Sequence, residues 1–342
     1  MPSHTDSNDS EKALVHPTPA MRRIPTQHPV WLRCAWARLH DRSTRTTGAR
    51  DIVGQLVRTP SRPARLTLAG AEATGEPCDL PWQDLAELAH QAAALAAQRA
   101  PLSLPRVPAH SPTIMALKRA FAGKGLVVVR PTLGTPVIHL DPSWQDPLAH
   151  FNAGRRSDFR RAQRHAEKLG AISFDVHTSP DPAQLDTLLD EAYAVEAQSW
   201  KGARGTALRL DPLLGPFFRE LAHQAAQEGI LYLAFMRIAG QPVAMQLAVV
   251  FDQALWLLKI GYDAQFSRCS PGSLLMVHTL ADAARSGWHR YEFLGSPAPW
   301  TEVWTQTLQA HVHVRVYPWS LPGLAALAQD TLQTARARML KL

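Results

Sequence analysis

The stretch from Gly261 to Ser296 combines turn residues with small polar side chains in an order that could hold a negatively charged ligand. Ser270-Pro271-Gly272-Ser273 interrupts a strand pattern, and apolar residues at helical spacing follow. A helix N-terminus after a strand and a tight turn offers backbone N–H groups to an anion. We therefore predict a pyrophosphate site there, with an ordinary helix start as the alternative interpretation. Its predicted members are Ser270, Gly272, Ser273 and Leu274.

One acidic side chain lies at the border of a predicted buried helix face. In the helix expected from about Ala183 to Trp200, Tyr193, Glu196 and Trp200 share one row beside the apolar stripe. Partial burial raises the pKa of a carboxyl toward the range of a general base, so Glu196 is a candidate base. An exposed Glu at the edge of the stripe fits the same pattern.

Two basic segments could neutralise phosphate groups. Arg160 and Arg164 share one face of a helix expected from Ser157, the predicted N-cap, to Lys168. The glycine-punctuated loop after Trp200 adds Lys201 and Arg204. A solvated helix face and a simple chain turn are the alternative interpretations of these two segments.

Composition places broad limits on the class of protein. The 342 residues, 46% hydrophobic and 19% charged, suit a folded chain of about two domains without a transmembrane helix. Three distant cysteines and a polar N-terminus without a signal pattern favour a reducing, cytoplasmic location. A net charge of +7 permits coenzyme A, nucleic acid or a membrane surface as partner. Because no RNA-binding signature is present, nucleic acid is not the expected main partner.

The predicted elements form a mixed α and β pattern. Before residue 150 we expect strands at 52–57, 64–68, 126–129 and 135–140, a helix after Trp82 and another from Ser111. From residue 172 we expect strand, helix, helix, three antiparallel strands, helix and strand. The final strand, 311–317, carries His311, His313 and Arg315 on one face. We interpret this face as the polar side of an end strand and not as a metal site, since no third ligand is apparent.

This order of elements resembles the GNAT superfamily of N-acyltransferases. The likeness is closest to its CelD-type branch, which is associated with cellulose and exopolysaccharide biosynthesis and is related to the Fem-type aminoacyltransferases. The stretches that carry it are Arg155–Lys168, Glu196–Gly202 with Gly205–Leu208, Gly261–Asp263 with Ser270–Gly272, and Glu292–Gly295.

The resemblance implies an α/β (α+β) fold with a mixed, mostly antiparallel twisted sheet flanked by helices. It also implies two tandem GNAT-like domains, the first of them degenerate. Together with the composition, it gives a disordered tail at 1–28, domains at 29–150 and 151–320, and a C-terminal helix at 321–342.

The implied function is transfer of an acyl group, most simply acetyl, from acyl-CoA to an amine or hydroxyl of a small molecule or sugar. Strands 254–262 and 290–295 would part to admit the pantetheine arm, and no metal is expected. Polysaccharide-synthesis proteins are further expected partners. The predicted coenzyme-binding residues are Ser270, Gly272, Ser273, Leu274, Arg160, Arg164 and Lys201. The predicted catalytic residues are Glu196 or Asp263 as base and Tyr262 as acid, and the predicted substrate-binding residues are Tyr193, Trp200 and Glu292.

One departure from the resemblance leaves two rival functions open. The family's Tyr-Lys pair is missing after Gly295, where Pro299-Trp300 stands instead. A non-catalytic accessory protein of a polysaccharide-synthesis complex would explain that loss. A Fem-type transferase that uses aminoacyl-tRNA would explain the basic charge, although no long heptad arm is visible in the sequence.

Overall fold

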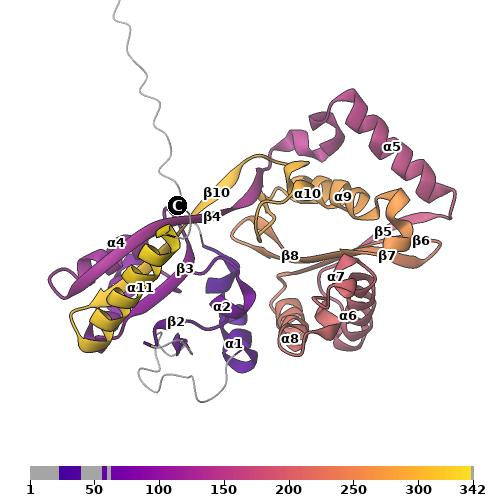
Figure 1. Ribbon diagram of the computed structural model, residues 1–342. Helices are drawn as coiled ribbons and strands as arrows, with labels where there is room; N and C mark the ends of the chain where they lie inside the picture. The colour runs from indigo at the N-terminus through magenta and orange to yellow at the C-terminus, as the bar shows by residue number, and fades with distance from the viewer. Residues whose placement is uncertain (1–22, 40–55, 60–62, 340–342) are drawn as a thin grey trace, which may run out of the picture.

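The computed structural model describes residues 23–39, 56–59 and 63–339. Within these ranges, strands join into one ten-stranded sheet in the order β1-β2-β3-β10-β4-β9-β8-β7-β6-β5 (Figure 1). Neighbouring strands are antiparallel except for β2–β3 and β8–β9. The strands are β1 (Leu56–Arg58), β2 (Leu66–Leu68), β3 (Leu102–Pro108), β4 (Gly125–His139), β5 (Ile172–His177), β6 (Leu231–Ile238), β7 (Gln241–Phe251), β8 (Ala254–Tyr262), β9 (Arg290–Glu292) and β10 (Leu308–Pro318).

Strand β4 connects the two halves of the sheet. From Gly125 to Pro136 it pairs with β10, and from Val137 to His139 it pairs with β9. The sequence predicted two strands here, 126–129 and 135–140, but the structure has one continuous strand. Its first part, which pairs with β10, is half-exposed and not buried as an apolar run of this type usually is.

Strand β10 returns to the first half of the molecule. It lies between β3 and β4, so the expectation of a polar end strand at 311–317 is wrong. His311 is 3% exposed and His313 is half-buried, with its Nε2 2.8 Å from Ser103 Oγ. Burial lowers the pKa of both imidazoles to about 4.

Helices cover both faces of the second half of the sheet. Figure 1 shows α5 and α9 on one face and α6, α7 and α8 on the other. Helix α1 also joins the second face, since Trp31 packs edge-on against Phe217 at 5.2 Å between ring centroids. The helices of this half are α1 (Pro29–Arg38), α5 (Ala153–Glu167), α6 (Pro182–Ala197), α7 (Trp200–Ala203), α8 (Leu214–Gln227), α9 (Pro271–Arg285) and α10 (Pro299–Glu302).

The remaining helices belong to the first half or are short connections. Helices α2, α3 and α4 pack with β1, β2 and β3 around one apolar cluster, and α11 lies on β10. Their bounds are α2 (Ala71–Thr74), α3 (Leu85–Gln98), α4 (Pro112–Ala120) and α11 (Leu321–Met339). The short 3-10 helices are η1 (Pro25–Gln27), η4 (Pro142–Gln145), η5 (Pro147–His150), η6 (Leu208–Leu210) and η7 (Ala264–Cys269).

Helix caps explain where several elements begin. Ser111 Oγ accepts a hydrogen bond from Thr113 N–H at the start of α4, as a cap residue should. The predicted cap Ser157 is wrong, because α5 begins four residues earlier, where Asn152 Oδ1 accepts the N–H of Arg155 at 2.9 Å. Residues 25–27, in the stretch expected to be disordered, form η1. The rest of that tail up to residue 22, and residues 52–55 of a predicted strand, lie outside the described ranges.

Candidate active site

Strands β8 and β9 are paired only at their beginnings. The pairs are Ala254–Arg290, Leu255–Tyr291 and Trp256–Glu292. Strand β8 continues to Tyr262, whereas β9 ends at Glu292. The two parallel strands therefore part beyond Trp256.

Two irregularities open this gap. The register of β8 against β7 shifts around Leu258, and a bulge of this kind bends and twists a strand. After β9, Leu294 and Gly295 have φ values of 55° and 56°, which turn the chain away from β8. A left-handed leucine is strained, so contacts with the rest of the fold must hold it in place.

Residues of the first half make those contacts. The N–H of Gly295 donates to Glu76 Oε2 at 3.4 Å, and the Arg106 guanidinium donates to the carbonyl of Gly295. Arg106 also donates to the carbonyl of Gly75 at 2.7 Å. Both backbone groups of Gly295 are thus held by the loop after α2 and by β3.

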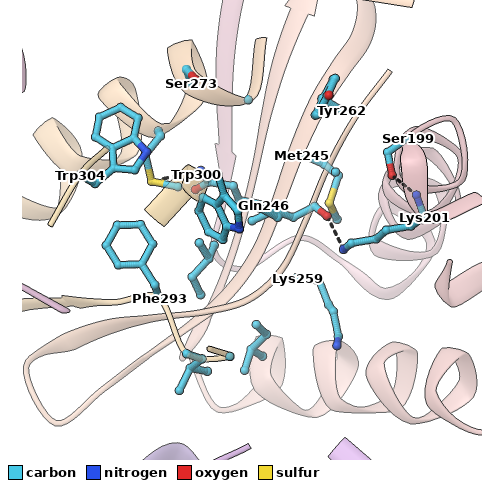
Figure 2. A pocket seen from close by; sticks show the side chains of 18 of the residues that line it. Ser199, Lys201, Met245, Gln246, Lys259, Tyr262, Ser273, Phe293, Trp300 and Trp304 are labelled. Atoms are coloured by element: carbon cyan, nitrogen blue, oxygen red, sulfur yellow. Dashed lines mark hydrogen bonds between the residues drawn. The ribbon is translucent and has the colours of Figure 1, made fainter. Parts of the chain in front are cut away.

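A cavity of about 580 Å³ occupies the gap between the strands, a size typical of small-molecule sites. Leu257 and Phe293 line it from the α9 face, and Leu258 and Leu294 line it from the α6 and α8 face. The cavity therefore passes through the sheet. Figure 2 shows the rings of Phe293, Trp300 and Trp304 on one side and Lys201 and Lys259 on the other.

The N-terminus of α9 faces this cavity. Ser270 has φ 44° and ψ 50°, and no side chain caps the helix. The N–H groups of Ser273 and Leu274 both bond to the carbonyl of Ser270, at 2.9 and 3.1 Å. Ser270, Gly272 and Ser273 line the cavity as predicted, whereas Leu274 is buried in the core and does not. Gly272 N–H and the positive end of the helix dipole are the main features here that attract an anion.

Tyr262 lies beside this helix start. It lines the cavity at the end of β8, and a Cβ on Gly272 would lie 3.7 Å from Tyr262 Cδ1. The tyrosine ring and the turn before α9 therefore form one wall of the site.

Glu196 is buried, as predicted, but it does not line the cavity. It is 1% exposed, and both of its carboxylate oxygens have protein partners. Oε1 accepts from Lys201 Nζ at 2.7 Å, and Oε2 accepts from the N–H of Leu208 at 2.8 Å. Lys201 does line the cavity, and it also donates to the carbonyl of Ile260 at 2.7 Å.

Two glycines bring these groups together. A Cβ on Gly261 would lie 2.7 Å from the Cα of Glu196, so only glycine lets β8 approach α6 this closely. A Cβ on Gly202 would lie 1.8 Å from the carbonyl oxygen of Ala197. Gly202 therefore permits the tight turn into α7 that folds Lys201 back onto Glu196.

Other predicted site residues lie away from the cavity. Asp263, 2% exposed, caps η7 by accepting the N–H of Gln265 at 2.9 Å. Glu292 is buried and accepts from Arg290 Nε at 3.2 Å. Tyr193 lines a separate hollow on the surface of α6 and α8, and its hydroxyl donates to the carbonyl of Gly215 at 2.8 Å.

Most of the residues predicted to neutralise phosphates do not line the cavity. Arg160 and Arg164 are exposed on α5 and do not line the cavity. Arg204 is exposed, and the side chain of Trp200 lies outside the described part of the structure. Lys201 is thus the one predicted phosphate-binding cation that the described structure brings to the cavity.

Two charged residues of the cavity, Glu76 and Lys259, were not predicted from the sequence. Burial raises the pKa of Glu76 and lowers that of Lys259. Lys259 had a signal that was overlooked, since it is a lone charge in the apolar strand 254–262. Glu76 had none, because it reaches the site from a loop far away in the sequence.

Two kinds of feature are absent from the described ranges. No helix there is long and apolar enough to cross a membrane. Among those residues, no group of three or more His, Cys, Asp or Glu could hold a metal ion.

The parted parallel strands and the helix N-terminus beside them are the features of a GNAT-type domain. Residues 153–302 match the family model of the Acetyltransferase (GNAT) domain. This part of the chain is therefore similar to a GNAT-type acetyltransferase domain.

Solved structures share the fold. The structure of FemX has a TM-score of 0.54 at 12% identity, covering 87% of this chain and 93% of the other. A conserved protein of unknown function from Bacteroides thetaiotaomicron VPI-5482 has a TM-score of 0.51 at 10% identity, covering 85% and 90%. At such identities the likeness shows the fold alone, namely an open, mostly antiparallel sheet flanked by helices. No curated protein sequence matches the chain significantly.

Proposed function

We propose that this protein transfers an acyl group from acyl-CoA to an amine or hydroxyl of a small acceptor. The observation that supports this most is the cavity that passes between β8 and β9 beside the uncapped N-terminus of α9. An acyl-CoA needs an anion site for its pyrophosphate and a narrow passage for its pantetheine arm. Both features adjoin the same cavity. Acetyl-CoA is the simplest donor. We also propose that the enzyme is cytoplasmic and acts on a sugar acceptor, as the resemblance to the CelD-type branch implies.

The donor would lie on the α9 face. Gly272 N–H, the hydroxyls of Ser270 and Ser273, and the helix dipole would hold the pyrophosphate. Trp300, which is 41% exposed at the cavity, would cover the arm. Arg160 and Arg164 are exposed on the neighbouring helix α5 and could reach only the outer phosphates.

The acceptor would lie on the opposite face, where Glu76 lines the cavity. Its carboxylate would take the proton of the acceptor amine or hydroxyl, in place of the predicted base Glu196. The nucleophile then attacks the thioester carbon, the new acyl bond forms, and the C–S bond breaks. Tyr262 would give its proton to the departing thiolate of coenzyme A. Glu196 would act indirectly by holding Lys201 in position.

A thermal-shift panel tests this proposal. A ligand that binds only the folded state raises the unfolding midpoint, so acetyl-CoA and other acyl-CoA esters should stabilise the protein. Adenosine alone should have a smaller effect. If no acyl-CoA shifts the midpoint, the donor assignment is wrong and the non-catalytic accessory function becomes the better account.

A second candidate is a Fem-type transferase that uses aminoacyl-tRNA. It is favoured by the exposed basic surface of α5, which could bind a polyanion. Its exposed basic residues are Arg155, Arg160, Arg161, Arg164 and His165. A gel shift with tRNA decides between the candidates, because an acyl-CoA enzyme should not retain tRNA at physiological salt.

A further inference from the structure

Lys259 is a half-buried cation that lines the cavity on the side opposite to α9 (Figure 2). Its Nζ lies 4.4 Å from the centre of the Phe218 ring on α8. Among the described residues, no oxygen accepts a hydrogen bond from it and no carboxylate pairs with it. An ammonium group has three N–H donors, so those of Lys259 are available to a ligand that enters the cavity.

Lys201 lines the same part of the cavity. Two of its three N–H donors are used, by Glu196 at 2.7 Å and by the carbonyl of Ile260 at 2.7 Å. One donor remains for a ligand. The positive charges of Lys201 and Lys259 also act on each other, since Lys201 lowers the pKa of Lys259.

The nearby carboxylates do not form an ion pair with the ammonium group of Lys259. Glu196 is already paired with Lys201 and bonded to Leu208. Glu76 attracts Lys259 only at a distance, and burial raises its pKa, which disfavours its charged form. A ligand that brings its own negative charge would satisfy Lys259 directly.

We propose that the acceptor carries an acidic group, a carboxylate or a phosphate, which binds Lys259 Nζ and the remaining donor of Lys201. The proposal rests on the acyl-CoA function given above and narrows the acceptor to an acidic amine or acidic alcohol. The acid group would bind Lys259, and the amine or hydroxyl of the same molecule would lie beside Glu76, with the thioester across the gap. Neutral amines and unmodified neutral sugars are the acceptors that this arrangement disfavours.

Calorimetry on the full chain saturated with coenzyme A tests the proposal. Coenzyme A would occupy the proposed anion site at α9 and cannot donate an acyl group. Any further anion that binds would therefore bind on the opposite side of the cavity, beside Lys201 and Lys259. The two probes are potassium phosphate and potassium acetate, titrated at constant ionic strength. Acetamide is the control, because it has nearly the shape of acetate but no charge. Phosphate or acetate should bind, and acetamide should not.

Variants assign the binding to one side chain. Lys259→Gln should weaken anion binding at least about tenfold, as expected for a hydrogen bond to a charged group. Lys259→Arg keeps the charge and should retain most of the binding, and the exposed Lys168→Gln is the matched control that should change nothing. Unfolding midpoints establish that each variant is folded.

Two results would overturn the acidic-acceptor proposal: no binding of either anion to the coenzyme-saturated wild type, or equal binding by Lys259→Gln and wild type. The preceding titration with coenzyme A is a separate test of the acyl-CoA function. If coenzyme A fails to bind while phosphate still binds through Lys259, the donor assignment falls and the anion site stands.

Discussion

Replacement of Glu196 by Gln separates a structural role of this residue from a catalytic one. The substitution keeps an oxygen for the N–H of Leu208 but removes the negative charge beside Lys201. The Glu196 side chain is 1% exposed and that of Lys201 is 17% exposed, so the pair is largely hidden from water. Breaking a buried ion pair from one side costs about 3–5 kcal/mol. In the variant, Lys201 still donates a hydrogen bond to the carbonyl of Ile260 and remains partly in contact with solvent. We therefore expect the free energy of unfolding to fall by about 3 kcal/mol, near the lower end of that range.

Urea denaturation and steady-state kinetics measure the two effects together. If Glu196 positions Lys201, Glu196→Gln should lower the free energy of unfolding by that amount and raise the acceptor KM. The double variant Glu196→Gln with Lys201→Met should be more stable than Glu196→Gln alone, because the ammonium group that lost its carboxylate partner is also removed. Glu191→Gln, in a more exposed ion pair with Arg237, is the control and should change little. Unchanged stability with abolished kcat would refute this reasoning and restore Glu196 as the base.

Three further predictions follow from other contacts. Arg106→Ala removes the hydrogen bonds to the carbonyls of Gly75 and Gly295, so it should cost about 1–3 kcal/mol in urea denaturation and weaken acetyl-CoA binding in calorimetry; unaltered affinity would show that Arg106 does not hold the gap open. If Glu76 is the base, Glu76→Gln should lower kcat about 100-fold or more and remove the acidic limb from the residual pH–rate profile, because burial raises the pKa of this carboxyl; an unchanged kcat or a retained limb assigns the role to another group. Burial raises the pKa of Asp79 to about 6 from 3.8, so its contribution to stability is complete below the unfolded value and is lost as pH rises through about 6. Asp79→Asn should therefore remove a decline of roughly 3 kcal/mol between pH 4 and 7, and the same decline in the variant would contradict this origin.

Local patterns in the sequence predicted the second half of the fold well. The strands β6, β7 and β8 and the helix α9 follow from apolar periodicity and turn residues, both of which are short-range properties. The predicted anion site rests on the same kind of signal, Ser-Pro-Gly-Ser between a strand and a helix, and three of its four predicted residues line the cavity. The fourth, Leu274, does not line the cavity, and its N–H bonds to the carbonyl of Ser270, which has a left-handed φ that the sequence did not indicate.

Contacts between distant segments could not be predicted from one sequence. The position of β10 between β3 and β4 joins residues about 200 positions apart, and nothing in either strand's composition specifies its neighbour. Glu76 and Arg106 reach the gap for the same reason. The position of Glu196 on its helix allowed burial or exposure, and the structure has it buried, with a partner, Lys201, that depends on the tight turn at Gly202. The division of the chain at residue 150 stays a prediction, since β4 and β10 connect both halves in one sheet.

Binding of coenzyme A to Gly272→Asp tests the central claim most directly, namely that the start of α9 holds the pyrophosphate. A carboxylate in the first turn complements the helix dipole, so this variant should be folded and at least as stable as the wild type. A Cβ at Gly272 meets Tyr262 only at ordinary contact distance, so Gly272→Ala is the matched control and should bind coenzyme A. Calorimetry should show binding by wild type and Gly272→Ala and none by folded Gly272→Asp, because the new charge repels the pyrophosphate. Wild-type affinity in Gly272→Asp would contradict the account.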